Sequence, residues 1–441
     1  MRTGYLGIDV GSSGVRATVI DKSGALLASA SDRVATAGLA PPALSSLMDG
    51  TVKLAMSHKT DIKLAALAVC AFGPAPIFLN DAGRVLGLLP MFAPYATHGS
   101  LKVGDDDLDS RVKSFRREEP RSYAAARIVC DVTGYLVWRL TGRMVMDTLT
   151  AKDFSKLSLP KRVKLPVTGT PLDQAGVLSR AAARRLGLPH GIPVVFGTYD
   201  SVGDLAATGF GAWRRTTIVL GSTLVLGVLT DRQVRDPSLR SMSHLGEGWF
   251  TGGWTNCAGS SLLLANQLLA QVGMRTQSTP LVLPYFSGER APIWSRQATG
   301  FIAGISATTT AADLHHAFIQ GVALSAADIA SRIEAECGKV GEWVVTGGGT
   351  RNHVLMAELA DALGARLAVI EGAHASLGPA VLAARSCGVD IRIPVAERYR
   401  GGSKRHAVYQ DRLRTYRRLY SSVAPLMGEI ARATGQGRKT K

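Results

Sequence analysis

Two stretches of this chain, about 210 residues apart, share one local pattern: an apolar strand, a turn of glycine and hydroxyl residues, and a second apolar strand. The first is GIDVGSSGVRATVID, Gly7–Asp21, and the second is TTIVLGSTLVLGVLTD, Thr216–Asp231. A third strand is predicted after each, at Ala25–Val34 and at Gly248–Gly253. A chain that twice begins a domain in this way is predicted to be internally duplicated.

The chemistry of the turns follows from their composition. They carry no bulky side chains over their backbone N–H groups, so these donors can converge on an anion such as a phosphate. Asp9 ends the first strand, where a Mg²⁺ accompanying that phosphate would take an oxygen ligand. An ordinary hairpin with a polar turn explains the first stretch equally well when it is considered alone. A dinucleotide-binding fingerprint is excluded, because the β-branched run Val15–Ile20 follows the glycines where a helix would be required.

Two further junctions carry polar residues. Pro193–Gly197 is a predicted strand, and Asp200 follows it at the head of a predicted helix, Val202–Thr208. An Asp at that position is either a helix N-cap or a carboxylate held at the mouth of a cleft. Later, strand Val344–Thr346 runs into the glycine turn Gly347–Asn352, which opens a helix whose free N–H groups point at whatever docks there.

The rest of the chain alternates strands, loops and helices, as in an α/β protein. We predict a strand at Ala65–Phe72, a hairpin over Ile77–Leu88, and helices at Pro42–His58, Ser122–Thr141, Thr170–Leu186, Ala311–Ala335 and His353–Leu363, with a last core helix opening at Ser376.

Two clusters contain metal-ligating residue types. The acidic loop Gly104–Asp109 could hold a metal, but we interpret it as a solvent-facing helix start. His315 and His316 are adjacent on a predicted helix, where their side chains point roughly 100° apart and cannot easily share one ion. We assign these two histidines to the surface and the core.

Length and composition bound the class of protein. At 441 residues the chain is too long for one ordinary core, and 46% hydrophobic with 19% charged residues is a globular composition. The five cysteines are scattered and never spaced as C-x-x-C, which argues against a disulfide scaffold or a structural zinc site. With no basic-then-apolar leader and no apolar run long enough to cross a bilayer, we expect a cytoplasmic protein.

The net charge of +17 invites a nucleic-acid interpretation. From Arg398 onward, however, 12 Lys and Arg stand against 2 Asp and Glu, so +10 of that charge belongs to the C-terminal tail. A solvated basic C-terminus explains this distribution, and the body of the chain is only mildly basic.

The motifs, taken in order, resemble those of the FGGY carbohydrate kinases, and most of all the xylulokinase group of pentulose kinases. The resemblance rests on DVGSSGVRATVID, GTYDSVGDLAATG, VLGSTLVLGVLTD, LPYFSGERAPIW, GFIAGISATTTAADLHHAFIQGVA and VTGGGTRN, and it spans nearly the whole chain. The tail AVYQDRLRTYRRLY resembles the Tyr-rich terminal helix of xylulokinases. No single motif is strong, but six in family order are.

The resemblance implies an α/β fold of duplicated ribonuclease H-like domains with a cleft between them, as in actin, hexokinase and the heat-shock ATPases. It implies an N-terminal domain at 1–211 on the sugar side, a C-terminal domain at 212–396 on the nucleotide side, and a basic helix and tail at 397–441. The implied substrates are a small-molecule sugar and ATP with Mg²⁺. A membrane or nucleic-acid partner is not expected, and a homodimer stays open.

The resemblance also implies roles for single residues. Asp200 would be the general base that takes the proton of the sugar hydroxyl, and Asp9 would lie near the Mg²⁺. Arg16 would add positive charge beside the phosphates. The nucleotide would be contacted by Gly11, Ser12 and Ser13, by Gly221, Ser222 and Thr223, and in the adenosine pocket by Gly347, Gly348 and Asn352.

The chain departs from the family on the sugar side. Related kinases carry a His- or Gln-bearing sugar loop where this chain reads AFGPAPIFL, around Gly73 and Pro74. A second sugar-side stretch usually holds an Asp-x-Arg element, and here it reads LLPMFAPYATHGS.

Three functional hypotheses follow. The first is phosphorylation of a ketopentose, D-xylulose before others, to its 5-phosphate. The second is the same reaction on D-ribulose, another ketose or a sugar alcohol. The third is a catalytically silent nucleotide-binding sensor or partner protein.

Overall fold

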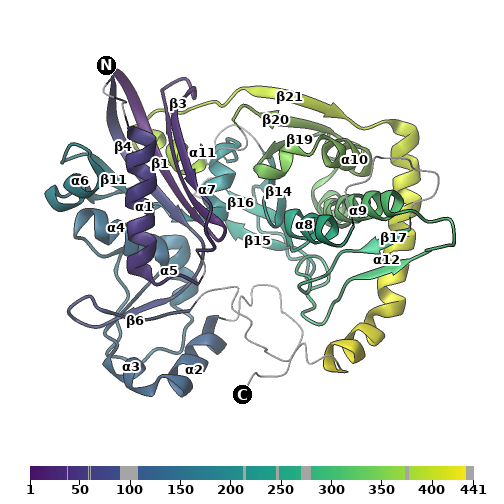
Figure 1. Cartoon of the computed structure of the whole chain (residues 1–441), viewed down its shortest axis with the longest axis horizontal. Helices are drawn as coiled ribbons and strands as arrows, with labels where there is room; N and C mark the ends of the chain where they lie inside the picture. The colour runs from purple at the N-terminus through teal and green to yellow at the C-terminus, as the bar shows by residue number, and fades with distance from the viewer. Residues whose placement is uncertain are drawn as a thin grey trace. The chain divides into compact units, whose positions relative to one another are not determined.

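The computed structural model describes residues 1–36, 38–57, 59, 61–89, 108–211, 215–244, 248–269, 280–372 and 377–433 (Figure 1). These residues form two compact units. Within the described ranges, the first unit holds residues 1–209 and 377–394, and the second holds residues 210–372 and 395–433. Each unit is built around its own mixed sheet.

The sheet of the first unit has the strand order β3-β2-β1-β4-β11-β10, and β12 also pairs with β4. Strand β1 is antiparallel to β2 and parallel to β4, which is parallel to β11. The strands are β1 (Arg2–Gly11), β2 (Gly14–Ile20), β3 (Leu26–Asp32), β4 (Ile62–Ala71), β10 (Gln174–Val177), β11 (Pro193–Val195) and β12 (Thr198–Tyr199).

The sheet of the second unit repeats this plan. Its order is β15-β16-β14-β13-β19-β20-β21, with β13 antiparallel to β14 and parallel to β19, which is parallel to β20. The strands are β13 (Thr216–Leu220), β14 (Leu224–Thr230), β15 (Arg240–Ser243), β16 (Trp249–Thr255), β19 (Glu342–Thr346), β20 (Arg366–Ile370) and β21 (Val395–Arg400). The predicted duplication is confirmed, down to the third strand of each half.

Helices cover both faces of the first sheet, and strand alternation decides which residues meet them. Leu6, Ile8 and Val10 of β1 share one core with α1 (Pro41–Met56), which Figure 1 shows lying across the sheet. Gly7 points to the other face, where a Cβ on it would lie 2.2 Å from the backbone N of Ala380. Asp9 alternates with Ile8, so its side chain shares the face of Gly7.

That second face is covered by α7 (Asp200–Ala207) and α11 (Leu377–Ser386), which cross at two glycines. A Cβ on Gly378 would lie 2.0 Å from the carbonyl oxygen of Gly203, and a Cβ on Gly203 would lie 2.6 Å from Cys70 Sγ on β4. No side chain fits at either glycine. Because α11 belongs to the first unit, the contiguous range 212–396 expected for a second domain is divided between the two units.

In the second unit, α9 (Ala311–Cys337) packs against β14, β16, α8 (Gly259–Leu268) and α10 (His353–Leu363). The long helix α12 (Ser403–Ala433) runs beside α9 and α10 (Figure 1). The predicted helices at 311–335 and 353–363 and the Tyr-rich terminal helix are therefore confirmed.

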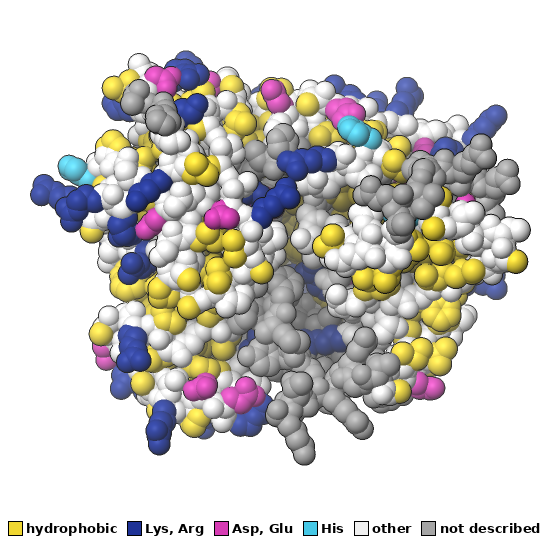
Figure 2. All heavy atoms as spheres, viewed as in Figure 1, with side chains coloured by type: hydrophobic (Ala, Val, Ile, Leu, Met, Phe, Trp, Pro, Cys, Tyr) yellow, Lys and Arg dark blue, Asp and Glu magenta, His cyan; other side chains and the backbone are white. Residues whose placement is uncertain are grey.

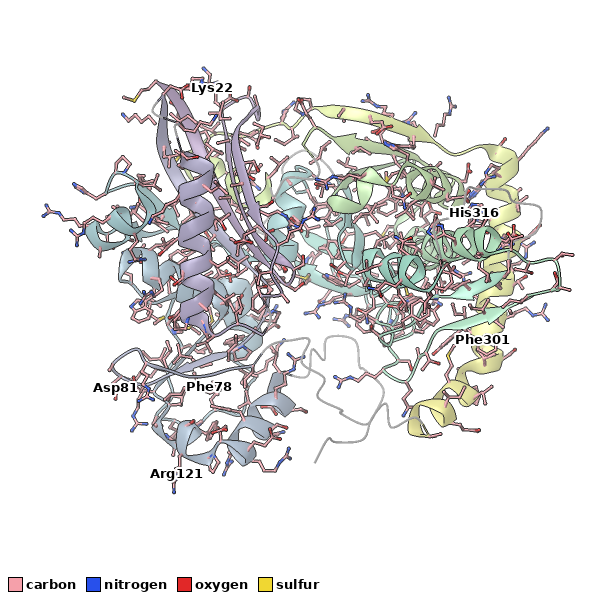
Figure 3. The ribbon with its side chains drawn as sticks, in the orientation of Figure 1. Lys22, Phe78, Asp81, Arg121, Phe301 and His316 are labelled. Carbon is pink, nitrogen blue, oxygen red and sulfur yellow. The ribbon has the colours of Figure 1, made fainter. Side chains whose placement is uncertain are left out.

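Buried carboxylates of α9 and α10 hold α12. Arg405 pairs with Glu358, at 2.6 Å between Nη2 and Oε1, and with Asp361, while Arg417 pairs with Asp328 at 2.7 Å. Glu358 also contacts Tyr409 Oη and, at 3.0 Å, Nε2 of the buried His316, which Figure 3 labels. Burial alone would raise the pKa of Glu358, but the bonds from His316 and Tyr409 and the charge of Arg405 lower it to about 2.

These ion pairs show what some of the basic residues of the C-terminal tail bind. Arg405 and Arg417 are bound within the second unit, and Arg412 donates to the carbonyl oxygen of Pro280 at 3.1 Å. On the face drawn in Figure 2, the Lys and Arg side chains stand in separate groups. Both observations favour a helix docked through its charges over a nucleic-acid interface.

Two predicted helices are wrong. Over 122–141 the structure has α3 (Pro120–Ala125), β7 (Ile128–Cys130) and α4 (Val132–Thr141), because β7 pairs with β5 and the Asp131 carboxylate caps α4. Over 170–186 it has β10, which pairs with β11, followed by α6 (Arg180–Leu186) capped by Ser179. Tertiary pairing overrides helix propensity in both places.

The remaining elements of the first unit are short. The predicted hairpin over 77–88 is confirmed as β5 (Ile77–Leu79) and β6 (Val85–Leu88), and α5 (Thr148–Phe154), β8 (Val145–Asp147) and β9 (Val167–Gly169) follow α4. Residues 104–107 of the acidic loop Gly104–Asp109 lie outside the described residues. The description resumes at Leu108, where α2 (Leu108–Glu118) begins. The sugar-side stretch LLPMFAPYATHGS lies outside them from residue 90.

In the second unit, β17 (Leu281–Leu283) pairs with β18 (Phe301–Ala303). All five cysteines are free thiols, with Cys70, Cys130 and Cys257 buried. Within the described part of the chain, none of the helices has the length and apolar character needed to cross a membrane.

Candidate active site

Asp9 and Arg16 face each other across the first hairpin. Their Cα atoms are partners in the β1–β2 ladder, and Arg16 Nη1 donates to Asp9 Oδ2 at 3.1 Å. The Asp9 side chain is 8% exposed and that of Arg16 is 39% exposed. A cross-strand pair of opposite charge stabilises the ladder, and here it also fixes a carboxylate at the strand end.

The turn after Asp9 depends on its glycines. Gly11 and Gly14 close the ladder around Ser12 and Ser13, and a Cβ on Gly11 would lie 3.8 Å from Asp9 Oδ2. Gly14 has φ of +152°, and a Cβ on it would lie 2.3 Å from the carbonyl oxygen of Asp32. Only glycine fits there. Asp9, Gly11, Ser12, Ser13 and Arg16 are thus together, as the sequence predicted.

Strand register brings Asp200 to the same end of the sheet. Cys70 of β4 is the Cα partner of both Asp9 and Thr198, so the three residues form one row across β1, β4 and β12. Asp200 follows two residues after Thr198 as the first residue of α7. Tyr199 is the N-cap residue, so the N-cap interpretation of Asp200 does not hold. Its Oδ1 accepts from Ser201 N at 2.7 Å.

A second carboxylate of α7, Asp204, lies beside them. Burial raises the pKa of Asp204 well above its usual range, the charges of Asp9 and Asp200 raise it further, and Arg16 lowers it. Burial and the same three carboxylates raise the pKa of the Cys70 thiol. Asp9, Asp200 and Asp204 therefore share one electrostatic environment.

Gly73 and Pro74 lie next to this group. They follow Phe72, the first residue after β4. The N–H of Phe72 donates to the carbonyl oxygen of Val10 at 2.8 Å. A Cβ on Gly73 would lie 3.3 Å from the Cβ of Tyr199, the residue before Asp200. The loop that the sequence assigns to the sugar thus borders the residue assigned as base.

In the second unit, two glycine turns meet. Gly221, Ser222 and Thr223 connect β13 to β14, and Gly221 N donates to the carbonyl oxygen of Thr223 at 2.9 Å. Gly347 has φ of +103°, and a Cβ on it would lie 2.4 Å from the carbonyl oxygen of Leu220. The glycine turn after β19 therefore touches the strand end from which the Gly221 turn begins.

Gly348 and Asn352 continue that second turn. Gly348 has open space around its Cα and begins the 3₁₀ turn η1 (Gly348–Arg351), while Asn352 Oδ1 accepts from Leu355 N at 3.0 Å and caps α10. The turn thus leads directly into the N-terminus of α10, whose positive dipole end favours an anionic or polar ligand.

Asp9 is the carboxylate predicted to meet a metal. Within the described ranges, no group of three or more His, Cys, Asp or Glu side chains is arranged to bind a metal ion. A kinase Mg²⁺ needs no such group, because it is held by one or two carboxylates, substrate phosphates and water. A nearly buried Asp9 beside an open glycine turn fits that requirement.

The comparison with known families is decisive at this point. Residues 192–387 match the C-terminal domain of the FGGY family of carbohydrate kinases, a range that contains Asp200, the Gly221 turn and the Gly347 turn. This match, with the relatives described next, supports a carbohydrate kinase of the FGGY type.

Similarity to FGGY proteins extends along the chain. It is 25% identical over 487 residues to the xylulose kinase of Escherichia coli, covering 96% of this chain and 100% of that protein. It is 25% identical over 368 residues to a ribulokinase of Mycolicibacterium smegmatis, covering 70% and 63%. Its fold matches the ligand-bound xylulose kinase of Lactobacillus acidophilus with a TM-score of 0.82 at 18% identity, covering 97% and 100%.

Three residues in or beside this candidate site were not predicted from the sequence. Asp204 follows Asp200 by four residues, a spacing that puts both on one face of a helix and could have revealed it. Thr36 and Ser260, which bond to the turns, lie in segments without a periodic or motif signal.

Proposed function

We propose that the protein is an ATP- and Mg²⁺-dependent kinase that phosphorylates a hydroxyl of a ketopentose, with D-xylulose as first candidate. The observation that carries the proposal is the row Asp9–Cys70–Thr198, by which one sheet presents a phosphate-type turn, Asp9 and Asp200 at the same end. The cytosol, where its five free thiols stay reduced, is the proposed compartment.

The proposed step is a direct displacement. The acceptor oxygen forms a bond to the γ-phosphorus, the bond to the oxygen of ADP breaks, and the hydroxyl proton passes to the carboxylate of Asp200. Asp200 needs only to accept a hydrogen bond as the new bond forms. In this proposal, Gly11, Ser12 and Ser13 contact the phosphates and Arg16 offsets their charge.

The remaining residues would hold the nucleotide and the metal. Gly221, Ser222 and Thr223 would donate to phosphates, and Gly347, Gly348 and Asn352 would line the adenosine pocket. Asp9 would take the Mg²⁺, which neutralises charge on the phosphate oxygens. In the same proposal, the first unit is the sugar side and the second unit is the nucleotide side, with α11 on the first unit although it lies within the expected range 212–396.

The acceptor is tested with a panel of D-xylulose, D-ribulose, hexuloses and sugar alcohols in a coupled assay of ADP release. The loop AFGPAPIFL lacks the His or Gln of related kinases, which is why acceptors beyond D-xylulose belong in the panel. A highest kcat/KM on D-xylulose supports the first candidate. ATP binding without turnover on any acceptor would instead indicate the nucleotide-binding sensor.

Asp200→Asn tests the base. It keeps the size and the bond from Ser201 N but removes the proton acceptor, so kcat is expected to fall about 10²- to 10⁴-fold with an unchanged KM for ATP. Ser179→Ala, which removes only the cap of α6, is the control for folding of the same unit. Full sugar-dependent ADP release by Asp200→Asn would refute the assignment.

A further inference from the structure

The two glycine turns are held in place by residues outside their hairpins. In the first unit, Thr36 N donates to the carbonyl oxygen of Ser12 at 3.1 Å, and Thr36 Oγ1 donates to that of Gly11. In the second unit, Ser260 N donates to the carbonyl oxygen of Ser222 at 3.0 Å, and Ser260 Oγ donates to the same oxygen at 2.9 Å.

These bonds occupy equivalent places in the duplicated fold. Thr36 comes four residues after the end of β3, which pairs with β2, and Ser260 comes five residues after the end of β16, which pairs with β14. Their surroundings differ, since Thr36 lies in a loop while Ser260 lies in the first turn of α8. The same backbone bond, from an N–H group to the carbonyl oxygen of the central serine of the turn, is made by two unlike segments, and each adds a hydroxyl bond to the turn.

These hydrogen bonds restrict the backbone freedom of the two glycine turns. Glycine loses more backbone freedom on ordering than other residues, and a loose turn would pay that cost when a phosphate binds. With the carbonyl oxygens of Gly11, Ser12 and Ser222 already bonded on one side, the turns are ordered before the ligand arrives. Thr36 is completely buried, and Ser260 is exposed.

We propose that Thr36 and Ser260 are positioning residues that order the two phosphate-binding turns, Thr36 for Gly11–Ser13 and Ser260 for Gly221–Thr223. The proposal rests on the proposed function, in which these turns contact the phosphates of ATP. The first turn lies beside Asp9 and Asp200, so Thr36 acts on the transferring phosphate. The second turn lies beside Gly347, so Ser260 acts on nucleotide affinity.

The test compares variants that remove only a hydroxyl with variants that restore it. Thr36→Val keeps the branched shape and Thr36→Ser restores the donor, while Ser260→Ala and Ser260→Thr form the second pair. Thr51→Val is the control, because the buried Thr51 Oγ1 donates to the carbonyl oxygen of Leu47 within α1, away from both turns. The readouts are kcat, the KM for ATP and for the acceptor, the Kd for ADP by calorimetry, and Tm.

One lost hydrogen bond corresponds to a change of about 3- to 10-fold. Thr36→Val is expected to lower kcat by that factor with the Kd for ADP near wild type, and Ser260→Ala to raise that Kd with kcat near wild type. The serine and threonine variants should recover most of each loss, and the KM for the acceptor should not move.

Equal behaviour of Thr36→Val and Thr36→Ser, or losses that follow Tm as they do in Thr51→Val, would overturn the proposal. A wild-type protein without turnover on any acceptor refutes the proposed function instead, and the Kd for ADP then still decides the Ser260 arm. A wild-type protein that binds no ADP overturns both.

Discussion

Asp204 shows how one side chain can be placed in a site without being its base. It lies one helical turn after Asp200, and Asp9, Asp200 and its own burial all disfavour its charge. Its neutral form can donate a hydrogen bond, whereas Asp200 must accept one. The two carboxyl groups of α7 are therefore suited to different roles.

Asp204→Asn separates these roles. Since the folded pKa of Asp204 is raised, its contribution to stability is present below the unfolded pKa and is lost as the pH rises through the folded pKa. The urea concentration at the midpoint of unfolding should therefore be higher for the amide variant than for wild type at pH 8. At pH 4 the two midpoints should be similar. Its kcat should fall much less than that of Asp200→Asn. A larger loss in Asp204→Asn would make Asp204 the base.

Residue-level prediction succeeded where the signal was local. Asp9, Arg16 and the Gly11 turn are a few positions apart in one hairpin, so strand alternation and glycine content were enough. Thr36 and Ser260 reach the turns through long-range bonds to backbone carbonyls. Neither spacing nor composition encodes such a bond.

Among the elements, α7 is the one whose position matters most for the proposed chemistry. It begins at Asp200 and is pressed between Cys70 of β4 and Gly378 of α11, with Gly203 at both contacts. Where a Cβ has no space, the helix must move. Its first residue would move with it.

Gly203→Ala is therefore expected to destabilise the protein by about 1–3 kcal/mol and to lower kcat, measured by urea unfolding and by ADP release. Gly50→Ala in α1 is the matched control, because Gly50 has no atom within 4 Å of an added Cβ, and alanine should stabilise that helix by roughly 0.5–1 kcal/mol. If both alanines stabilised the protein, the crowding at Gly203 would not be real.

Element-level prediction failed in two instructive places. Ile128–Cys130 and Gln174–Val177 were absorbed into predicted helices, but each pairs with a strand distant in sequence. The predicted helix ends at Thr141 and Leu186 are confirmed, because the glycine that follows each is left-handed and terminates the helix by its own conformation. Local stop signals were readable, and partners across the sheet were not.

For the whole molecule, part of the positive charge of the C-terminal helix attaches it to the second unit. The carboxylates of Glu358, Asp361 and Asp328 are nearly buried, and α12 brings the arginines that neutralise them. Removing the arginine from such a pair would leave an uncompensated buried carboxylate, which costs about 3–5 kcal/mol.

Glu358→Gln removes instead the carboxylate that His316, Arg405 and Tyr409 bind, so it should loosen α12 and lower the free energy of unfolding by roughly 1–3 kcal/mol at pH 7. Because the pKa of Glu358 is lowered to about 2, its contribution is present above the unfolded pKa and is lost as the pH falls from about 4.5 towards 2. Urea unfolding at pH 7 and pH 3, with limited proteolysis of α12, measures both. Arg414→Ala, in a pair whose side chains are 70% and 71% exposed, should change little.

The packing of α11 on β1 has a consequence for how the chain is made. Gly7 emerges from the ribosome near the start of synthesis, but Ala380, the residue it packs against, comes more than 370 residues later. During translation, the part of the second face that α11 covers stays exposed while residues 210–372 of the second unit are produced. A nascent chain stalled before Leu377 would lack both α11 on the first sheet and the edge strand β21 of the second, an apt substrate for a chaperone.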